Sequence, residues 1–215
     1  MIPLRDTIPS ATVPLVNYGI IVANVLVFLY ETSLGPYFER FIFAYGLVPN
    51  DFSLTALFTS MFLHGGWGHL LGNMLYLYIF GDNVEDRIGH GRYLVFYLLC
   101  GMAAGAAQAV ANPSSDVPMV GASGAIAGVS GAYFLFFPRA RVVTLVPIFL
   151  FLQVMEVPAL FFLLIWFVWQ VLSGVANLGA TSGGVAFWAH VGGFLAGMAL
   201  GPVLRGRRVP TPNWA

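Results

Sequence analysis

Six apolar stretches, separated by short polar segments, constrain this chain more than any other feature. A helix needs about 20 apolar residues to cross a bilayer, so stretches of this kind are candidate membrane spans. Only 8% of the 215 residues are charged, whereas soluble domains carry about 25% charged residues. The stretches are 18–34, 70–81, 93–111, 123–137, 157–175 and 186–204. We therefore predict an all-α integral membrane protein, with six transmembrane helices forming a bundle.

The apolar region 142–175 is too long for one span and allows two interpretations. Pro147 and Pro158 interrupt any helix there, and Gln153 and Glu156 add polar groups to its first half. We predict that 142–156 is an interfacial or partly immersed segment and that 157–175 crosses the membrane. The alternative, two crossings, would give seven spans.

The distribution of arginine favours the six-span interpretation. Segments on the cytoplasmic side of a membrane are enriched in Arg and Lys. With six spans and both termini inside, eight of the nine basic residues lie on that side and only Arg40 lies outside. Seven spans would move three C-terminal arginines outside. We predict one membrane domain over 1–215, with short cytoplasmic tails at 1–15 and 205–215, in a bacterial inner or plasma membrane.

This orientation brings three polar features to one depth near the outer face. His69 and Asn73 begin the second span, Ser123 begins the fourth, and His190 lies about one turn into the sixth. Ionisable groups inside a membrane are costly and usually functional. A shared site explains their common depth.

The residue types at this depth suggest acyl-transfer chemistry. A serine hydroxyl needs a nearby base to become a nucleophile, and His190 is the one histidine in a late span. Contact between them requires two helix backbones to approach closely, which small residues at helical spacing permit. Glycines recur beside both Ser123 and His190, although such stripes alone are more often packing features. We predict a Ser123–His190 catalytic dyad.

The oxyanion of such a reaction needs hydrogen-bond donors. The backbone N–H of Ser123 is unpaired at a helix start, and His69 and Asn73 share one helix face. A membrane Asn is by default a packing residue, but the adjacent His weakens that interpretation. There is no H-E-x-x-H zinc motif, and the lone Cys100 matches no metal or disulfide pattern. We predict neither metal nor cofactor, and the zero net charge argues against nucleic acid as a partner.

Four motifs in this order resemble the rhomboid family of intramembrane serine proteases. They are "HGGWGHLLGN", "GDNVEDRIG", "GASG" and "AHVGG". The resemblance implies a six-helix rhomboid-like bundle whose Ser–His dyad cleaves single-span membrane proteins near the outer face. It also implies an oxyanion hole formed by His69, Asn73 and the Ser123 N–H. The open alternative is a non-catalytic relative that binds or scaffolds membrane helices, although both reacting residues are present. The sequence leaves oligomeric state and substrate-binding residues open.

Several neighbouring residues carry secondary expectations. Some rhomboids place an aromatic ring on the histidine from four residues after the serine, where this chain has Ala127, so another group must orient His190. His64 is expected to fix a loop and to point away from His69. Trp166 and Trp169 are expected to face lipid or the interface. The segment "NLGATSGG" (177–184) is expected to act as a lid.

Overall fold

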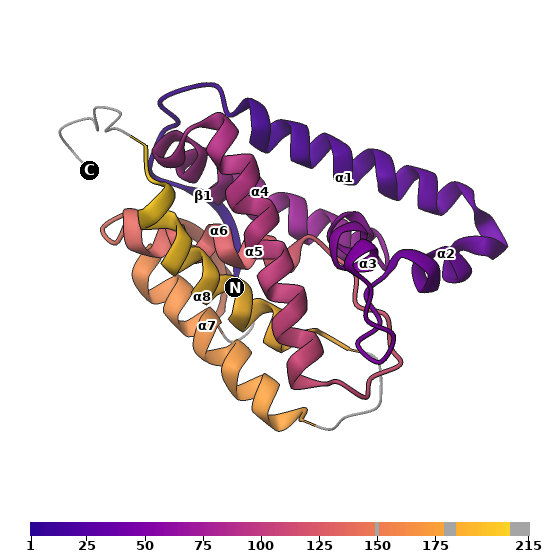
Figure 1. Cartoon of the computed structure of the whole chain (residues 1–215). Helices are drawn as coiled ribbons and strands as arrows, with labels where there is room; N and C mark the ends of the chain where they lie inside the picture. Colours follow the sequence, from indigo (N-terminus) through magenta and orange to yellow (C-terminus); the bar gives the residue numbers. More distant parts are fainter. Residues whose placement is uncertain (149–150, 179–183, 207–215) are drawn as a thin grey trace.

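A computed structural model describes residues 1–148, 151–178 and 184–206 and shows a helical bundle (Figure 1). The described residues also form a small three-stranded sheet. The α-helices of these ranges are α1 (Leu15–Ser33), α2 (Phe38–Tyr45), α3 (Leu54–Thr59), α4 (Trp67–Ile88), α5 (His90–Ala111), α6 (Ser123–Phe136), α7 (Ala159–Ala176) and α8 (Phe187–Leu204). The strands are β1 (Ile2–Asp6), β2 (Arg141–Ile148) and β3 (Phe151–Pro158), and two 3₁₀ turns are η1 (Gly35–Tyr37) and η2 (Ser60–Phe62). A mostly helical fold is confirmed.

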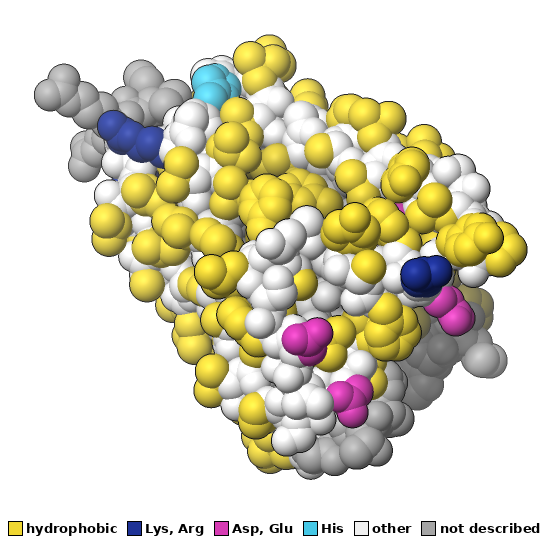
Figure 2. Space-filling model, turned by 45° about the vertical axis from the view of Figure 1, so that its right-hand side comes forward, with side chains coloured by type: hydrophobic (Ala, Val, Ile, Leu, Met, Phe, Trp, Pro, Cys, Tyr) yellow, Lys and Arg dark blue, Asp and Glu magenta, His cyan; other side chains and the backbone are white. Residues whose placement is uncertain are grey.

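The helices α1, α5, α7 and α8 are long and apolar enough to cross a membrane. Helix α6 is apolar but has 14 residues, and α4 has 22 residues but ends in an acidic segment around Glu85. All six predicted stretches thus contain a helix, and the count of six crossings stays a prediction. Hydrophobic side chains cover most of the face in Figure 2, where charged groups are few. The chain is an integral membrane protein.

Residues 142–148 and 151–156 lie in the two paired strands of a β-hairpin, which was not predicted from the sequence. Strands β2 and β3 pair antiparallel from Arg141↔Pro158 to Ile148↔Phe151, and β1 adds to the other edge of β2. β-Branched side chains such as the valines of β2 favour a strand, but hydropathy alone does not separate a short apolar strand from a helix. One helix, α7, follows the hairpin, so the described residues of 142–175 do not form two helical crossings.

Residues 1–15 pack against the bundle, although we expected a tail. Ile2 pairs with Leu145 in the sheet, and the Tyr133 hydroxyl donates to the Asp6 carboxylate at 2.5 Å. The backbone N–H of Gly206 donates to the carbonyl of Arg87 at 2.9 Å. The segments assigned to the cytoplasmic side by charge therefore meet at one end of the molecule. The rest of the predicted tail, 207–215, lies outside the described residues.

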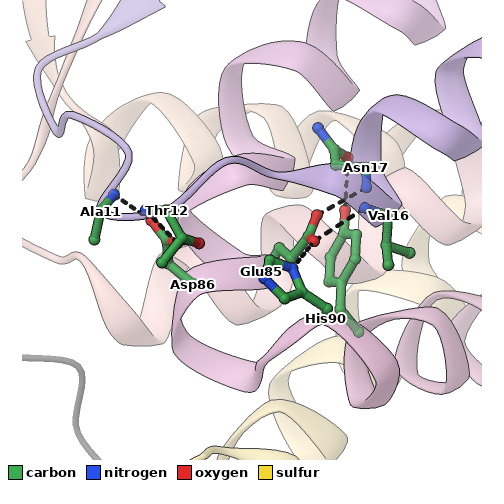
Figure 3. A network of polar contacts seen from close by, with 8 residues as sticks. Ala11, Thr12, Val16, Asn17, Glu85, Asp86 and His90 are labelled. Carbon is green, nitrogen blue, oxygen red and sulfur yellow. Dashed lines mark hydrogen bonds and ion pairs between the residues drawn. The ribbon is translucent and has the colours of Figure 1, made fainter.

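Glu85 of α4 caps the first turn of α1 at this same end (Figure 3). Its carboxylate accepts hydrogen bonds from the backbone N–H groups of Val16 at 3.0 Å and Asn17 at 2.8 Å, and it also contacts His90. These N–H groups have no partner within their own helix. Gly81 lets Asn17 approach, since a Cβ there would lie 2.1 Å from the Asn17 Oδ1. The second motif is thus an anchor between α1 and α4.

Helices α6 and α8 touch backbone to backbone. A Cβ on Gly193 would lie 2.0 Å from the carbonyl oxygen of Gly124, and one on Gly197 would lie 1.9 Å from that of Gly128. The close approach predicted from the glycine stripes is confirmed. These two helices carry Ser123 and His190, so the glycines hold the two side chains within reach of each other.

Candidate active site

The structure brings Ser123 and His190 together. Ser123 is the first residue of α6 and His190 lies in the first turn of α8. The His190 Nε2 and the Ser123 Oγ are 2.8 Å apart, which is hydrogen-bond distance. A general base must be within this reach of the proton that it removes. The geometry fits a Ser–His dyad.

The second ring nitrogen of His190 contacts Gln170 of α7. The distance from His190 Nδ1 to Gln170 Oε1 is 2.8 Å, and Gln170 is 6% exposed. The sequence analysis did not select this residue. One available signal was the presence of a glutamine within an apolar stretch, because polar groups in such helices seek partners.

Trp166, one turn before Gln170, packs beside the His190 ring. The ring centroids lie 5.7 Å apart, with an interplanar angle of 37°, and Trp166 lines the cavity at Ser123. The expectation that Trp166 faces lipid or the interface is wrong, because its side of α7 faces α8. Trp169 is 65% exposed, which agrees with the prediction for that residue. Ala127, where some rhomboids carry a ring, is buried.

His69 and Asn73 of α4 line the same cavity as Ser123 and His190, a space of about 750 Å³. Both side chains converge on Gly121, two residues before the serine. A Cβ on Gly121 would lie 2.7 Å from the His69 Nε2 and 3.5 Å from the Asn73 Nδ2. Gly121 also has φ +126°, which only glycine adopts readily. The four predicted site residues thus surround one cavity.

His64 is buried and hydrogen-bonded to Asn73, and its ring centroid lies 5.2 Å from that of His69, so the expectation that it points away from His69 is wrong. Its Nε2 lies 3.0 Å from the Asn73 Nδ2, and burial lowers the pKa of His64 to about 4. A neutral ring can accept from the Asn73 amide. The five-residue spacing misled us because α4 begins at Trp67, so His64 is not helical. His64 lies in the loop before α4, and its backbone N–H donates to Glu31 Oε2 at 3.2 Å, whereas its role in fixing that loop stays a prediction.

The rest of the cavity wall is dominated by small residues. Glycine and alanine contributed by α4, α5 and α6 leave the space open beside Ser123, and Asn177 and Gly184, the two ends of the predicted lid, also line it. The middle of that lid, 179–183, lies outside the described residues. Within the described ranges, no three His, Cys, Asp or Glu side chains gather in a way that could hold a metal ion.

The chain is similar in sequence to known rhomboid proteins. The chain is 36% identical over 124 residues to "Rhomboid protease GluP" of Bacillus subtilis, covering 55% of this chain and 24% of that protein. It is 29% identical over 196 residues to "Rhomboid protein 1, mitochondrial" of Saccharomyces cerevisiae, covering 86% of this chain and 51% of that protein. The chain therefore spans about half or less of the length of these relatives.

A family model described as the Rhomboid domain matches residues 51–207, from the segment before α3 to the end of α8. The match includes Ser123, His190, His69 and Asn73. It covers well over half of the chain and agrees with the helical, membrane-spanning fold. The chain belongs to the rhomboid family.

Proposed function

We propose that this chain is an intramembrane serine endopeptidase that cleaves single-span membrane proteins near the outer face of the membrane. The observation that carries the proposal is the 2.8 Å contact between the His190 Nε2 and the Ser123 Oγ inside a cavity. Relatives named as proteases in the same family add support. Both termini are then cytoplasmic, and the membrane is a bacterial inner or plasma membrane.

The proposed reaction proceeds in two steps. His190 takes the proton of Ser123 as Oγ attacks the carbonyl carbon of the scissile peptide bond. The same proton then passes to the leaving amine as the C–N bond breaks, which leaves an acyl ester on Ser123. A water molecule, deprotonated by His190, hydrolyses that ester and regenerates the serine hydroxyl.

The oxyanion formed in each step is stabilised by hydrogen bonds from the Ser123 backbone N–H, His69 and Asn73. These groups border the cavity around Gly121. Donors that are held in place before reaction cost no reorganisation in the transition state. A substrate helix must unwind locally to reach them, because its peptide bonds are engaged in intrahelical hydrogen bonds.

The test is cleavage of a single-span substrate by the purified protein in detergent, together with labelling of Ser123 by a fluorophosphonate. We expect wild type to cleave the substrate and to be labelled. Ser123→Ala and His190→Ala should do neither, because the two residues act as a unit. Labelling also reports on the dyad when the chosen substrate is a poor one.

Two outcomes would overturn the proposal. Cleavage that persists in His190→Ala would exclude the dyad. A folded wild type that neither cleaves nor reacts with the fluorophosphonate would favour the alternative, a non-catalytic member that binds or scaffolds membrane helices.

A further inference from the structure

We propose that Gln170 is a positioning residue that holds His190 in its catalytic tautomer, so that Ser123, His190 and Gln170 form one hydrogen-bonded chain. The inference deepens the proposed function and rests on it. Gln170 comes from α7, a different helix from either reacting residue. Catalytic competence would then depend on three helices: α6, α7 and α8.

The contacts of the His190 ring support this role. Among the described residues, the ring has hydrogen-bond partners at both nitrogens, Ser123 at Nε2 and Gln170 at Nδ1, both at 2.8 Å. The two bonds lie on opposite sides of the imidazole. A ring held at both nitrogens cannot swing away from the serine without losing a hydrogen bond inside a buried site, which is costly.

The chemistry of the amide selects the tautomer. A Gln170 oxygen facing Nδ1 accepts a hydrogen bond from an N–H at that nitrogen, so Nδ1 carries the hydrogen and Nε2 keeps its lone pair. Nε2 can then receive the Ser123 proton. The opposite tautomer would direct an N–H at the serine oxygen and leave no base. In other serine hydrolases a carboxylate holds the histidine in this way.

Gln170 and Trp166 together replace the orienting group that Ala127 cannot provide. They are four residues apart, so they lie on one face of α7. Trp166 borders the ring of His190 while Gln170 holds its far nitrogen. Helix α7 thus supplies both the ring contact and the hydrogen bond.

A neutral amide orients the imidazole but adds no negative charge to stabilise the imidazolium. We therefore expect the loss of Gln170 to lower kcat and to leave KM nearly unchanged. Among the described residues, His69 of α4 interacts electrostatically with His190 from another helix. Every variant below retains His69.

The experiment compares Gln170→Leu, Gln170→Glu and Trp169→Leu with wild type, using substrate cleavage and the rate of fluorophosphonate labelling across pH. Gln170→Leu removes the acceptor at similar size and should lower both rates by roughly tenfold or more, because general-base catalysis contributes about 10²–10⁴-fold. Gln170→Glu restores an acceptor and should recover much of the rate. The acid limb of the pH–rate profile of Gln170→Glu should move to higher pH, since an adjacent carboxylate favours the protonated His190 ring. Trp169→Leu changes an exposed neighbour on α7 and should match wild type.

The pH profile separates positioning from a purely structural role. If Gln170→Leu keeps the wild-type labelling rate, the positioning role of Gln170 is excluded. The same holds if Gln170→Glu regains activity without any movement of the acid limb of its pH–rate profile. Thermal unfolding of each variant in detergent identifies losses that come from misfolding. A wild type that is not labelled at all instead overturns the proposed function, so the two failures are distinguishable.

Discussion

At the scale of single residues, Asn73 shows how one side chain can serve two partners. Its amide has two N–H groups, and the 3.0 Å contact to the His64 Nε2 engages one of them. The other is left for the cavity, where we place the oxyanion. His64 thereby sets the orientation of the amide, while its own backbone is held by Glu31 of α1.

We predict that Asn73→Ala lowers turnover by roughly 100-fold, the usual cost of losing one oxyanion donor. KM should change little, because the interaction strengthens only in the transition state. The measurement is kcat for a single-span substrate in detergent. Asn83→Ala, a substitution on the same helix that removes a hydrogen bond to the Ile8 carbonyl, serves as the matched control and should affect stability more than turnover. Normal turnover in Asn73→Ala would remove that residue from the site.

His64 gives a pH prediction with a definite sign. Its pKa is lowered from 6.5 to about 4 by burial, so the folded state binds fewer protons than the unfolded state between these values. The contribution of neutral His64 to the free energy of unfolding is therefore present above pH 6.5 and is lost as the pH falls toward 4. His64→Gln should show a smaller loss of thermal stability than wild type from pH 6.5 to 4. Equal slopes for the two proteins would contradict the assignment.

At the scale of elements, the helices are joined by specific contacts at their ends and faces. Glu85 joins α4 to the start of α1, and glycines join α6 to α8. The first contact is polar and directional, whereas the second depends on the absence of side chains. A substitution at Glu85 removes hydrogen bonds, whereas a substitution at one of these glycines adds atoms that overlap the facing helix.

Replacing Glu85 with Gln should destabilise the fold by roughly 1–3 kcal/mol. The carboxylate accepts two backbone N–H groups at a helix start, and hydrogen bonds to charged groups contribute about 1.5–3 kcal/mol each. An amide keeps one acceptor and loses the charge that suits this helix end. The check is thermal unfolding in detergent, with Glu39→Gln, an exposed acid of α2, as the control. Equal effects of both changes would count against the cap.

Gly197→Ala should destabilise α8 against α6 by roughly 1–3 kcal/mol, the usual cost of overpacking. The added Cβ would lie 1.9 Å from the Gly128 carbonyl oxygen, and backbone cannot move aside as a side chain can. Gly19→Ala on α1 meets no atom within 4 Å and is the matched control. Both thermal stability and fluorophosphonate labelling should decrease in Gly197→Ala, and neither should decrease in Gly19→Ala. Unchanged unfolding of that variant would show that the two helices are not in contact.

At the scale of the whole molecule, hydropathy and motif order predicted the helices and the four site residues. The length of each apolar run located the stretches, and the depth argument grouped Ser123 and His190. Partners that depend on helix rotation were missed, because the facing side of α7 cannot be deduced from an apolar stretch. Gln170 and Trp166 are in this class. The hairpin was missed because its apolar valines fit either a strand or an immersed segment.

The predicted topology can be tested with single cysteines in a Cys100→Ser background. Ser114 and Asn177 are exposed just after α5 and α7, whereas Arg139 is exposed just before β2. A membrane-impermeant thiol reagent on intact cells should label cysteine at 114 and 177 and miss it at 139. Labelling at 139 from outside would reverse the orientation and put the cavity mouth on the cytoplasmic side.

The pairing of β1 with β2 has a consequence for how the protein is made. Ile2 leaves the ribosome long before Leu145, its partner in the sheet. Translation proceeds at about 5–20 residues per second, so the first strand waits roughly 7–30 s for the second. During that interval several helices enter the membrane while β1 has no strand to join. The sheet therefore closes late and joins β1, which is synthesised well before β2, to a bundle that is already largely inserted.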